Sequence, residues 1–446
     1  MGGTIQVAQD SDTLSTLLPE LVSTNNTRLH NFGQGLADGC PSKKELWHVL
    51  HSQLEKTLPE KRNFGVLLGF LSVCAESDPE FYHSTLDGLI SDNILGEWFP
   101  IFQTTATIDE KGVERLHKSL DTGKALIHTF ICLSGGCAHE SIGDDELAGL
   151  LRKILYKEEG IDVVVRILSM RFRGPKENPP QYSKNLIAVA REVLSMYPFP
   201  SERRRHNNLD HSLAQIASVC LKGEEGKSTA SEICRHLIDS IRDNRIYYFD
   251  YPCLFDNLAR LQPFVFLDLC LGNDGIEHNY LRRMFSDNFA THNNPMDQIS
   301  DDDLISWCDS DPENRYPLIA SSIQAFSEST EKDELVVIAS AIQASAGSTA
   351  KDELAWKPLV YSIFERAPNL DTVLACLADG IRPMSWSGSR ADILQKRSVL
   401  FQSLYHHDNA EISAWARSQY LKLQEEIKRE REWEDRQNRK RNESFE

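Results

Sequence analysis

Apolar residues recur along most of the chain at the spacing of an α-helix. Residues 66–73 follow this spacing with Val, Leu and Phe, and residues 147–155 follow it with Leu and Ile. Side chains three and four positions apart lie on the same face of a helix, so each segment has one apolar face. The segments are short, about 10–16 residues, and alternating strand patterns are few. The pattern therefore predicts a nearly all-α protein.

Polar residues mark where several of these helices begin. Asp78 precedes Pro79 and an acidic residue, which places a capping side chain before a proline in the first helical turn. Residues 309–313 repeat this arrangement. Carboxylates at 144–146 and 301–303 lie where the positive end of the helix dipole favours them. We therefore expect helices to begin at or near all four places.

Two segments about a hundred residues apart resemble each other. Residues 29–40 and 127–137 each carry a His two positions before a Phe, and each then becomes rich in glycine and small residues. We expect His30 and His128 to lie on helix faces and the glycines to end the helices. Self-similar helical units are typical of solenoids, although no strict-period repeat signature is present. The predicted fold is an irregular α-solenoid of stacked helical hairpins, HEAT-like, with a charged C-terminal helix.

Breaks in the pattern suggest four regions. We predict an N-terminal helical repeat region at 1–175, a middle helical repeat region at 176–380 and a C-terminal helical pair at 381–424. The remainder, 425–446, is almost entirely charged or amide-bearing and is predicted to be a projecting, frayed helix or a disordered tail. Its simplest role is a solubilising cap on the end of the array.

Charge and cysteine content limit the partners and the compartment. The 446-residue chain has a formal net charge of −18, which disfavours whole-surface binding to nucleic acid. Arg203, Arg204 and Arg205 form the best local basic patch, although a solvated loop explains them better. Ten cysteines without a CxxC pair favour a reducing compartment. We expect a cytoplasmic protein that does not bind a membrane, since neither a signal peptide nor an apolar span is recognisable.

Catalytic motifs are missing, so we expect no enzymatic activity, no cofactor and no metal. Cys132, Cys137 and His139 lie close in sequence but lack the spacing of a zinc site. His407 and Asp408 are similar to the His-Asp pair of metal-dependent phosphohydrolases. A turn in which Asp408 caps the next helix explains them better. A lone cysteine nucleophile would need a nearby base, and nothing in the sequence singles out one cysteine among ten.

Tryptophans supply the best candidates for contact with a partner. Trp386 lies in a loop rich in Ser and Gly and is followed by Arg390, and Trp and Arg dominate the energetics of interfaces. Alternatively, Trp386 folds back over the last helical pair, with Ser389 capping the helix from Arg390. Trp98 is a further candidate anchor.

Several segments resemble the C-terminal part of large bacterial multidomain proteins. These are residues 97–103, 112–116, 386–391, 401, 407–408, 415–416 and the Glu/Arg-rich end. In such proteins HEAT-like helical repeats follow an NTPase core of the STAND or related P-loop type, often linked to anti-phage defence. The resemblance implies a helical sensor or scaffold. It carries over no catalytic residue, because the nucleotide site and effector have no counterpart in this sequence.

The leading hypothesis is therefore a non-enzymatic scaffold or sensor that binds a protein partner in a bacterial defence or signalling system. The partner could be an NTPase or effector encoded nearby. A second hypothesis is a nucleic-acid-associated accessory factor that uses the arginines at 203–205 and the basic residues of the tail, namely Lys428, Arg429, Arg431, Arg436, Arg439, Lys440 and Arg441. A third is an all-α metal-dependent hydrolase around His407 and Asp408.

Overall fold

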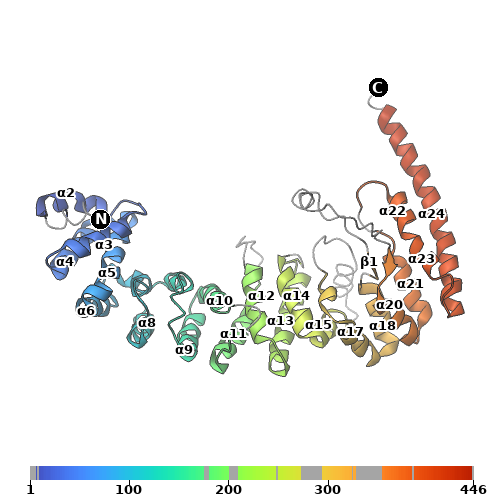
Figure 1. The fold of residues 1–446 in the computed structure, drawn as a ribbon, viewed down its shortest axis with the longest axis horizontal. Coiled ribbons are helices and arrows are strands. Elements are labelled where there is room, and N and C mark those ends of the chain that lie inside the picture. Colours follow the sequence, from blue (N-terminus) through green and yellow to red (C-terminus); the bar gives the residue numbers. More distant parts are fainter. Residues whose placement is uncertain are drawn as a thin grey trace, which may run out of the picture. The chain divides into compact units, whose positions relative to one another are not determined.

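The computed structural model describes residues 7, 10–174, 180–199, 209–247, 250–272, 294–323, 325–327, 354–383 and 386–443. Within these residues the protein is all-α, as predicted (Figure 1). The strands found there are one short antiparallel pair, in which Phe326 lies opposite Trp356. Internal contacts divide the chain into two compact units, Met1–Tyr197 with Gln215–Cys220, and Pro198–Ala214 with Leu221–Glu446.

The first unit consists of short helices that each contact the next one or two along the chain. Contacts join α3 to α5, α7 to η3, η3 to α10 and α9 to α11. The helices are α2 (Ser11–Leu21), α3 (Leu29–Gly39), α4 (Lys43–Lys56), η1 (Pro59–Lys61), α5 (Gly65–Ser77), α6 (Pro79–Leu89), η2 (Gly96–Trp98), α7 (Phe99–Gln103), α8 (Glu110–Thr122), η3 (Ile127–Ser134), α9 (Asp144–Leu155), α10 (Gly160–Arg171) and α11 (Lys184–Met196). α12 (Leu209–Cys220) is divided between the two units.

The second unit continues with short helices and ends in a long one. α18 contacts α21, and α22 and α23 both pack on α24. The elements are η4 (Glu224–Gly226), α13 (Lys227–Arg242), α14 (Pro252–Leu261), α15 (Pro263–Cys270), η6 (Pro295–Gln298), α17 (Asp301–Asp309), α18 (Pro312–Ser322), β1 (Phe326–Ser327), β2 (Ala355–Trp356), α20 (Pro358–Arg366), α21 (Leu370–Gly380), α22 (Arg390–Arg397), α23 (Val399–Ser403) and α24 (Ala410–Glu443).

All four predicted helix starts are confirmed, and one shows how the cap works. α6 begins at Pro79, and the carboxylate of Asp78 accepts a hydrogen bond from the backbone N–H of Phe81 at 3.2 Å. That bond satisfies one of the amides that a helix N-terminus leaves without an internal partner. α9, α17 and α18 begin at Asp144, Asp301 and Pro312. The local signals for helix starts were therefore sufficient.

The first unit extends beyond the predicted boundary at 175. Oδ2 of Asp144, at the start of α9, accepts a hydrogen bond from the backbone N–H of Ser183 at 2.7 Å. The hydroxyl of Tyr182 donates to the carbonyl of Arg171 at 3.0 Å. The predicted boundary therefore falls within a unit, because α11 packs back on α9.

The first echoed segment ends its helix at a glycine as expected, but it also has a glycine in the helix interior. α3 ends at Gly39, whereas Gly33 lies inside it. α3 and α5 approach so closely that a Cβ on Gly33 would be 2.0 Å from the carbonyl oxygen of Val66. A Cβ on Gly69 would be 1.9 Å from the carbonyl oxygen of His30. The glycines therefore allow two helix backbones to touch, which overrides their low helix propensity.

The second echoed segment is a 3-10 helix, not the expected α-helix. η3 spans Ile127–Ser134 and presents His128 to solvent, so both histidines lie on helix faces as expected. The hydroxyls of Thr129 and Ser134 each donate to the carbonyl three residues earlier, at 2.6 and 2.7 Å. These bonds suit the tighter turn of a 3-10 helix. The two segments therefore share an amphipathic pattern but not a helix type.

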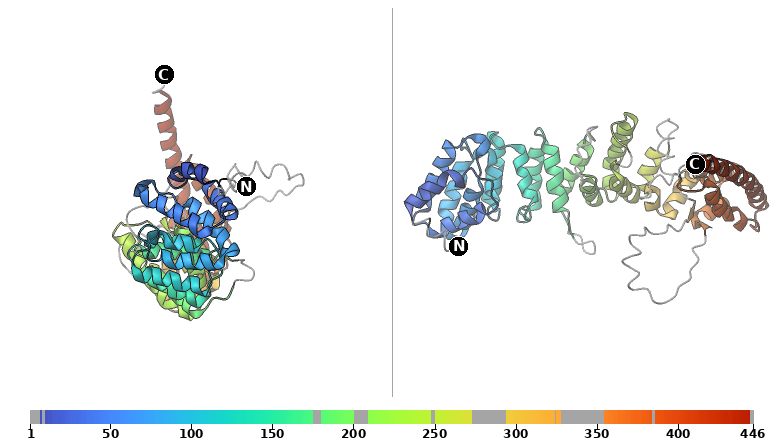
Figure 2. Two further views of the ribbon diagram at one scale, coloured as in Figure 1. Left: turned by 90° about the vertical axis from the view of Figure 1, so that its left-hand side faces the viewer. Right: turned by 90° about the horizontal axis from the view of Figure 1, so that it is seen from above.

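The C-terminal pair differs from the prediction. The first helix of the pair predicted at 381–424 is two shorter helices, α22 and α23, while α24 runs without a break through the predicted division at 424. Ile427 is 2% exposed, so the charged segment begins as a docked helix and not as a frayed one. Only the last part of α24 extends past α22 (Figures 1 and 2). None of the helices in the described residues has the length and apolar character needed to cross a bilayer.

A partly buried ion pair joins α4 to the loop after α6. Nε2 of His51 lies 3.0 Å from Oδ2 of Asp92. The hydrogen bond to Asp92 raises the pKa of His51 despite partial burial. Burial alone would raise the pKa of Asp92, but His51 and the backbone N–H groups of Ile94 and Leu95 lower it to about 2. The pair is therefore charged over a wide range of mildly acidic pH.

Replacing His51 with glutamine should reduce the free energy of unfolding by about 1–2 kcal/mol at mildly acidic pH. Because the pKa of His51 is raised, its contribution is complete below the unfolded value of 6.5 and is lost as pH rises through the folded value. The contribution of Asp92 is present above 3.8 and is lost as pH falls towards about 2. Urea unfolding across this range measures the difference. A gap between wild type and His51→Gln that is unchanged from about pH 5 to about pH 8.5 would contradict this assignment.

Candidate interaction surface

Three aromatic rings from three separate helical segments form a row on the first unit. Phe64 precedes α5, Trp98 ends η2 and His128 lies in η3. The ring of Trp98 is 5.4 Å from that of Phe64 and 6.0 Å from that of His128, centroid to centroid. Each pair of this kind contributes about 0.5–1.5 kcal/mol beyond area burial. The row therefore joins three segments that are distant in sequence.

The row rests on a buried layer. Phe102 and Phe130 are fully buried beneath it, and Phe102 also contacts Phe64 at 6.2 Å. The backbone N–H of Leu126 donates to the carbonyl of Glu97 at 3.1 Å, which fixes η3 beside η2. Trp98 is accordingly half-buried, held on both sides by other rings. Its position is set by packing before any partner arrives.

Apolar side chains beside the row face solvent. Leu126 is 36% exposed and Ile131 is 42% exposed, at the start and in the middle of the η3 segment. The imidazole of His128 is also exposed. An apolar surface with a fixed aromatic centre is the usual core of a protein interface. The three rings and these two apolar side chains form one surface. We call this surface of Phe64, Trp98, Leu126, His128 and Ile131 the aromatic row.

The three rings of the row stand at similar intervals in the sequence. Ring-bearing residues stand at 30, 64, 98 and 128, at intervals of 34 (64 − 30), 34 (98 − 64) and 30 (128 − 98) residues. His30 lies in α3, beside the start of α5. Its backbone nitrogen is 3.9 Å from the point where a Cβ on Gly65 would lie. Ring contacts join the residues at 64, 98 and 128.

Arg390 is engaged within the protein. Its guanidinium binds Glu426 at 2.8 Å and Glu430 at 3.0 Å, and its side chain is 17% exposed. Ser389 caps α22 by accepting a hydrogen bond from the backbone N–H of Asp392 at 3.1 Å, as the second interpretation of this loop expects. Arg390 therefore holds α24 in place.

Trp386 combines features of both interpretations. The guanidinium of Arg390 lies 5.3 Å from the centre of its ring, yet 48% of the residue is exposed. Its role as a contact for a partner stays a prediction. Arg203, Arg204 and Arg205 lie outside the described residues, so the basic patch also stays a prediction.

The candidate metal-binding residues have other partners. Nδ1–H of His139 donates to the carbonyl of Leu133 at 3.0 Å, and burial raises the pKa of the Cys132 thiol to about 12. His407 stacks on Tyr361, with the ring centres 6.4 Å apart. Within the described part of the chain, no three His, Cys, Asp or Glu side chains are grouped as metal ligands.

The cap of α24 was assigned to the wrong residue. The side-chain oxygen of Asn409 accepts a hydrogen bond from the backbone N–H of Glu411 at 2.9 Å. The backbone N–H of Asn409 in turn donates to Nδ1 of His407 at 3.1 Å. Asp408 itself is exposed. The turn interpretation of this segment holds, but the capping side chain is one residue later.

One cysteine does lie beside a possible base. Sγ of Cys253, in the first turn of α14, is 3.3 Å from Nδ1 of His211. Asp210 fixes this arrangement by accepting hydrogen bonds from the backbone N–H groups of Cys253 and Leu254, both at 2.9 Å. Burial and the carboxylate of Asp210 raise the pKa of Cys253 to about 12. The thiol is therefore protonated near neutral pH and is not an activated nucleophile.

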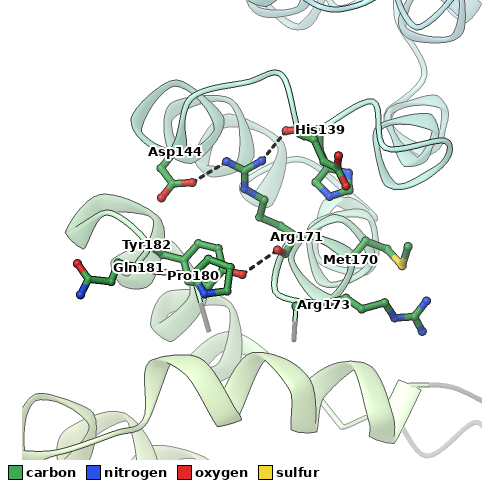
Figure 3. Close-up of a pocket in the computed structure, with 10 residues that line it drawn as sticks. His139, Asp144, Met170, Arg171, Arg173, Pro180, Gln181 and Tyr182 are labelled. Atoms are coloured by element: carbon green, nitrogen blue, oxygen red, sulfur yellow. Dashed lines mark hydrogen bonds and ion pairs between the residues drawn. The ribbon is translucent and has the colours of Figure 1, made fainter. Parts of the chain in front are cut away.

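A cavity of about 580 Å³ lies between α9, α10 and the start of α11 (Figure 3). Arg171 extends along it and donates to the carbonyl of His139 at 2.9 Å and to Asp144 at 2.8 Å (Figure 3). Tyr182 donates to the carbonyl of Arg171. Burial lowers the pKa of His139, which keeps its imidazole neutral. These polar groups form hydrogen bonds to one another or to the backbone and so join three helices. None of them is therefore left to recognise a ligand in the cavity.

The comparison with known proteins gives no relative from which a role could be transferred. No protein-family model matches the sequence, and no curated protein is significantly similar to it.

Proposed function

We propose that this protein is a non-enzymatic helical scaffold that binds a protein partner through the aromatic row. The observation that carries the proposal is the combination of a fixed Trp98 with the exposed apolar side chains of Leu126 and Ile131. Burying such side chains against a partner releases about 25 cal/mol for each Å² of apolar area.

Rigidity adds to the suitability of the surface. Trp98 is packed between Phe64 and His128 and would lose little side-chain freedom on binding. The successive hairpins of the first unit would present this surface as an α-solenoid does, with each helical segment contributing one ring.

The biological setting in the proposal comes from the resemblance to the helical regions of bacterial STAND and related NTPases. In those proteins the helical repeats act as sensors beside an NTPase core. This chain would supply the helical sensor, and a separate NTPase or effector would supply the activity.

Introducing charge into the row should abolish partner binding without unfolding the protein. The test is affinity purification from the native host, comparing wild type with the double variant Leu126→Asp and Ile131→Asp. Both positions are already exposed, so the effect on stability should stay within about 0.5–1 kcal/mol. We expect wild type to recover one protein in stoichiometric amount and the variant to lose it by at least about tenfold.

The matched control is Leu421→Asp in the second unit, where the native leucine is 65% exposed. It introduces the same group on an exposed apolar position away from the row and should retain the partner. Recovery of no stoichiometric protein, or equal recovery with the double variant, would contradict the proposal. Circular dichroism of all three proteins shows that the helices are intact.

A further inference from the structure

The structure sorts the charges of α24 onto different faces. Glu426, Glu430 and Glu434 point towards α22 and its flanking loop. The first two bind Arg390, and Glu434 accepts a hydrogen bond from the hydroxyl of Ser389 at 2.7 Å. Glu426 and Glu430 are therefore paired with a cation within the protein, and Glu434 is hydrogen-bonded there. The sequence, in which acidic and basic residues alternate, does not reveal this separation.

The outward side of the same segment is basic. Between 428 and 440 the exposed basic residues are Lys428, Arg429, Arg431, Arg436, Arg439 and Lys440, and the exposed acidic residues are Glu432 and Asp435. Within the described residues, Arg436, Arg439 and Lys440 form no ion pair. An acidic protein thus carries a local basic surface at the end of α24, which extends past α22 (Figures 1 and 2).

An aromatic ring lies in the middle of this surface. Trp433 is 50% exposed, although the opposite side of α24 is docked as far as Glu434. Arg429, Trp433, Arg436 and Lys440 are spaced 4, 3 and 4 residues apart and fall within an arc of about 60° at 100° per residue. They form one stripe, about 16 Å long at 1.5 Å per residue. We call these four residues the α24 stripe.

We propose that the α24 stripe binds single-stranded nucleic acid, with the cations on phosphates and a base stacked on Trp433. Guanidinium and ammonium groups bind the backbone without regard to sequence, and an exposed ring offers a face on which any base can stack. Together these two features favour a single strand over a duplex, whose bases are already stacked. They also favour it over an anionic membrane, because the stripe has one apolar side chain among three cations.

This inference is independent of the protein partner proposed for the first unit. The aromatic row and the α24 stripe belong to different compact units, and no residue is shared between them. Either proposal can therefore fail while the other stands.

The test is fluorescence anisotropy of a labelled single-stranded RNA of mixed sequence, titrated with the full chain. Arg439 lies next to the stripe, so about four cations can reach phosphates, and the slope of log K against log salt should be near −3. Affinity should consequently fall about 50-fold between 50 and 200 mM salt. A duplex of the same sequence and phosphatidylserine vesicles are measured in parallel and should bind at least about fivefold more weakly.

Two variants separate the contributions. Trp433→Leu keeps an apolar side chain but removes the stacking surface, and should weaken binding about fivefold or more with little change in the salt slope. The double variant Arg436→Glu and Lys440→Glu should abolish binding at 150 mM salt and flatten the slope by about 1.4. The control with the same charge change is Lys44→Glu with Lys111→Glu, at two exposed positions of the first unit.

The expected result is that the control variant binds as wild type does. The proposal is overturned if single-stranded RNA does not bind at 50 mM salt or if the control weakens binding as much as the stripe variant. It is equally overturned if the duplex or the vesicles bind as tightly as the single strand. If Trp433→Leu binds the RNA as tightly as wild type, no base stacks on Trp433. The proposed preference for single strands is then overturned as well.

Discussion

Replacing Gly69 with alanine should lower the free energy of unfolding of the first unit by about 3 kcal/mol, the upper end of the usual cost of overpacking. The new methyl group would lie 1.9 Å from the carbonyl oxygen of His30. That obstacle belongs to the backbone of α3, so no rotamer change can relieve it. α3 and α5 would have to separate, which would disturb the buried layer containing Leu36 and Phe70. Urea unfolding followed by circular dichroism measures the change.

The matched control for this experiment is Gly88→Ala near the end of α6. A Cβ at Gly88 would have nothing within 4 Å. Alanine there should increase stability by about 0.5–1 kcal/mol, because it reduces the freedom of the unfolded chain and favours the helix. If both variants change stability by the same amount and sign, the close approach of α3 and α5 does not exist as described. Gly33→Ala should behave like Gly69→Ala, since it meets the carbonyl of Val66 at 2.0 Å.

Replacing Arg390 with methionine should destabilise the second unit by about 2 kcal/mol and release α24 from α22. Methionine preserves much of the packing but leaves Glu426 and Glu430 without their shared guanidinium. Both carboxylates are more than three-quarters buried, at 23% and 20% exposed, so water screens them poorly. Hydrogen exchange of α24 should report the release, with faster exchange from Ile427 onwards. The control is Arg366→Met, whose pair with Asp309 is exposed and should be worth less than about 0.5 kcal/mol.

The pH dependence of the ion pairs between Arg390 and α24 follows from Glu426. Burial would raise its pKa, but Arg390 and Arg382 together lower it below the ordinary value of 4.5. A group with a lowered pKa contributes stability above its unfolded value, and that contribution is lost as pH falls through the folded value. The gap in stability between wild type and Arg390→Met should therefore narrow below about pH 4. A gap that widens as pH falls would show that Glu426 is not the group that Arg390 stabilises.

Helix starts depend on local sequence signals, whereas helix contacts depend on residues far apart in the chain. Helix starts at Pro79 and Asp144 were predictable because their signals lie within a few residues of the start. Gly33 was misleading because its role depends on α5, more than thirty residues away in the chain. Asn409 instead of Asp408 caps α24 because His407 fixes the turn through the backbone of Asn409.

The same distinction applies to the candidate surfaces. Trp98 could be named from composition alone, since a tryptophan in a short helical segment is a common interface residue. Its neighbours could not, because Phe64 and His128 reach it only when three segments pack together. Arg390 was predicted to contact a partner because arginine contributes strongly to interfaces. In the structure, two carboxylates of α24 bind its guanidinium instead.

The sequence by itself determined that this protein is all-α, where many of its helices begin and that its acidic charge is interrupted by basic segments. These properties depend on periodicity, capping and composition, which act over a few residues. The tertiary structure decided which glycines join helices, which rings form the aromatic row and which face of α24 is basic. Those outcomes depend on contacts between residues far apart in the chain. Because the helices are irregularly spaced, no local sequence pattern predicts which of these residues will meet.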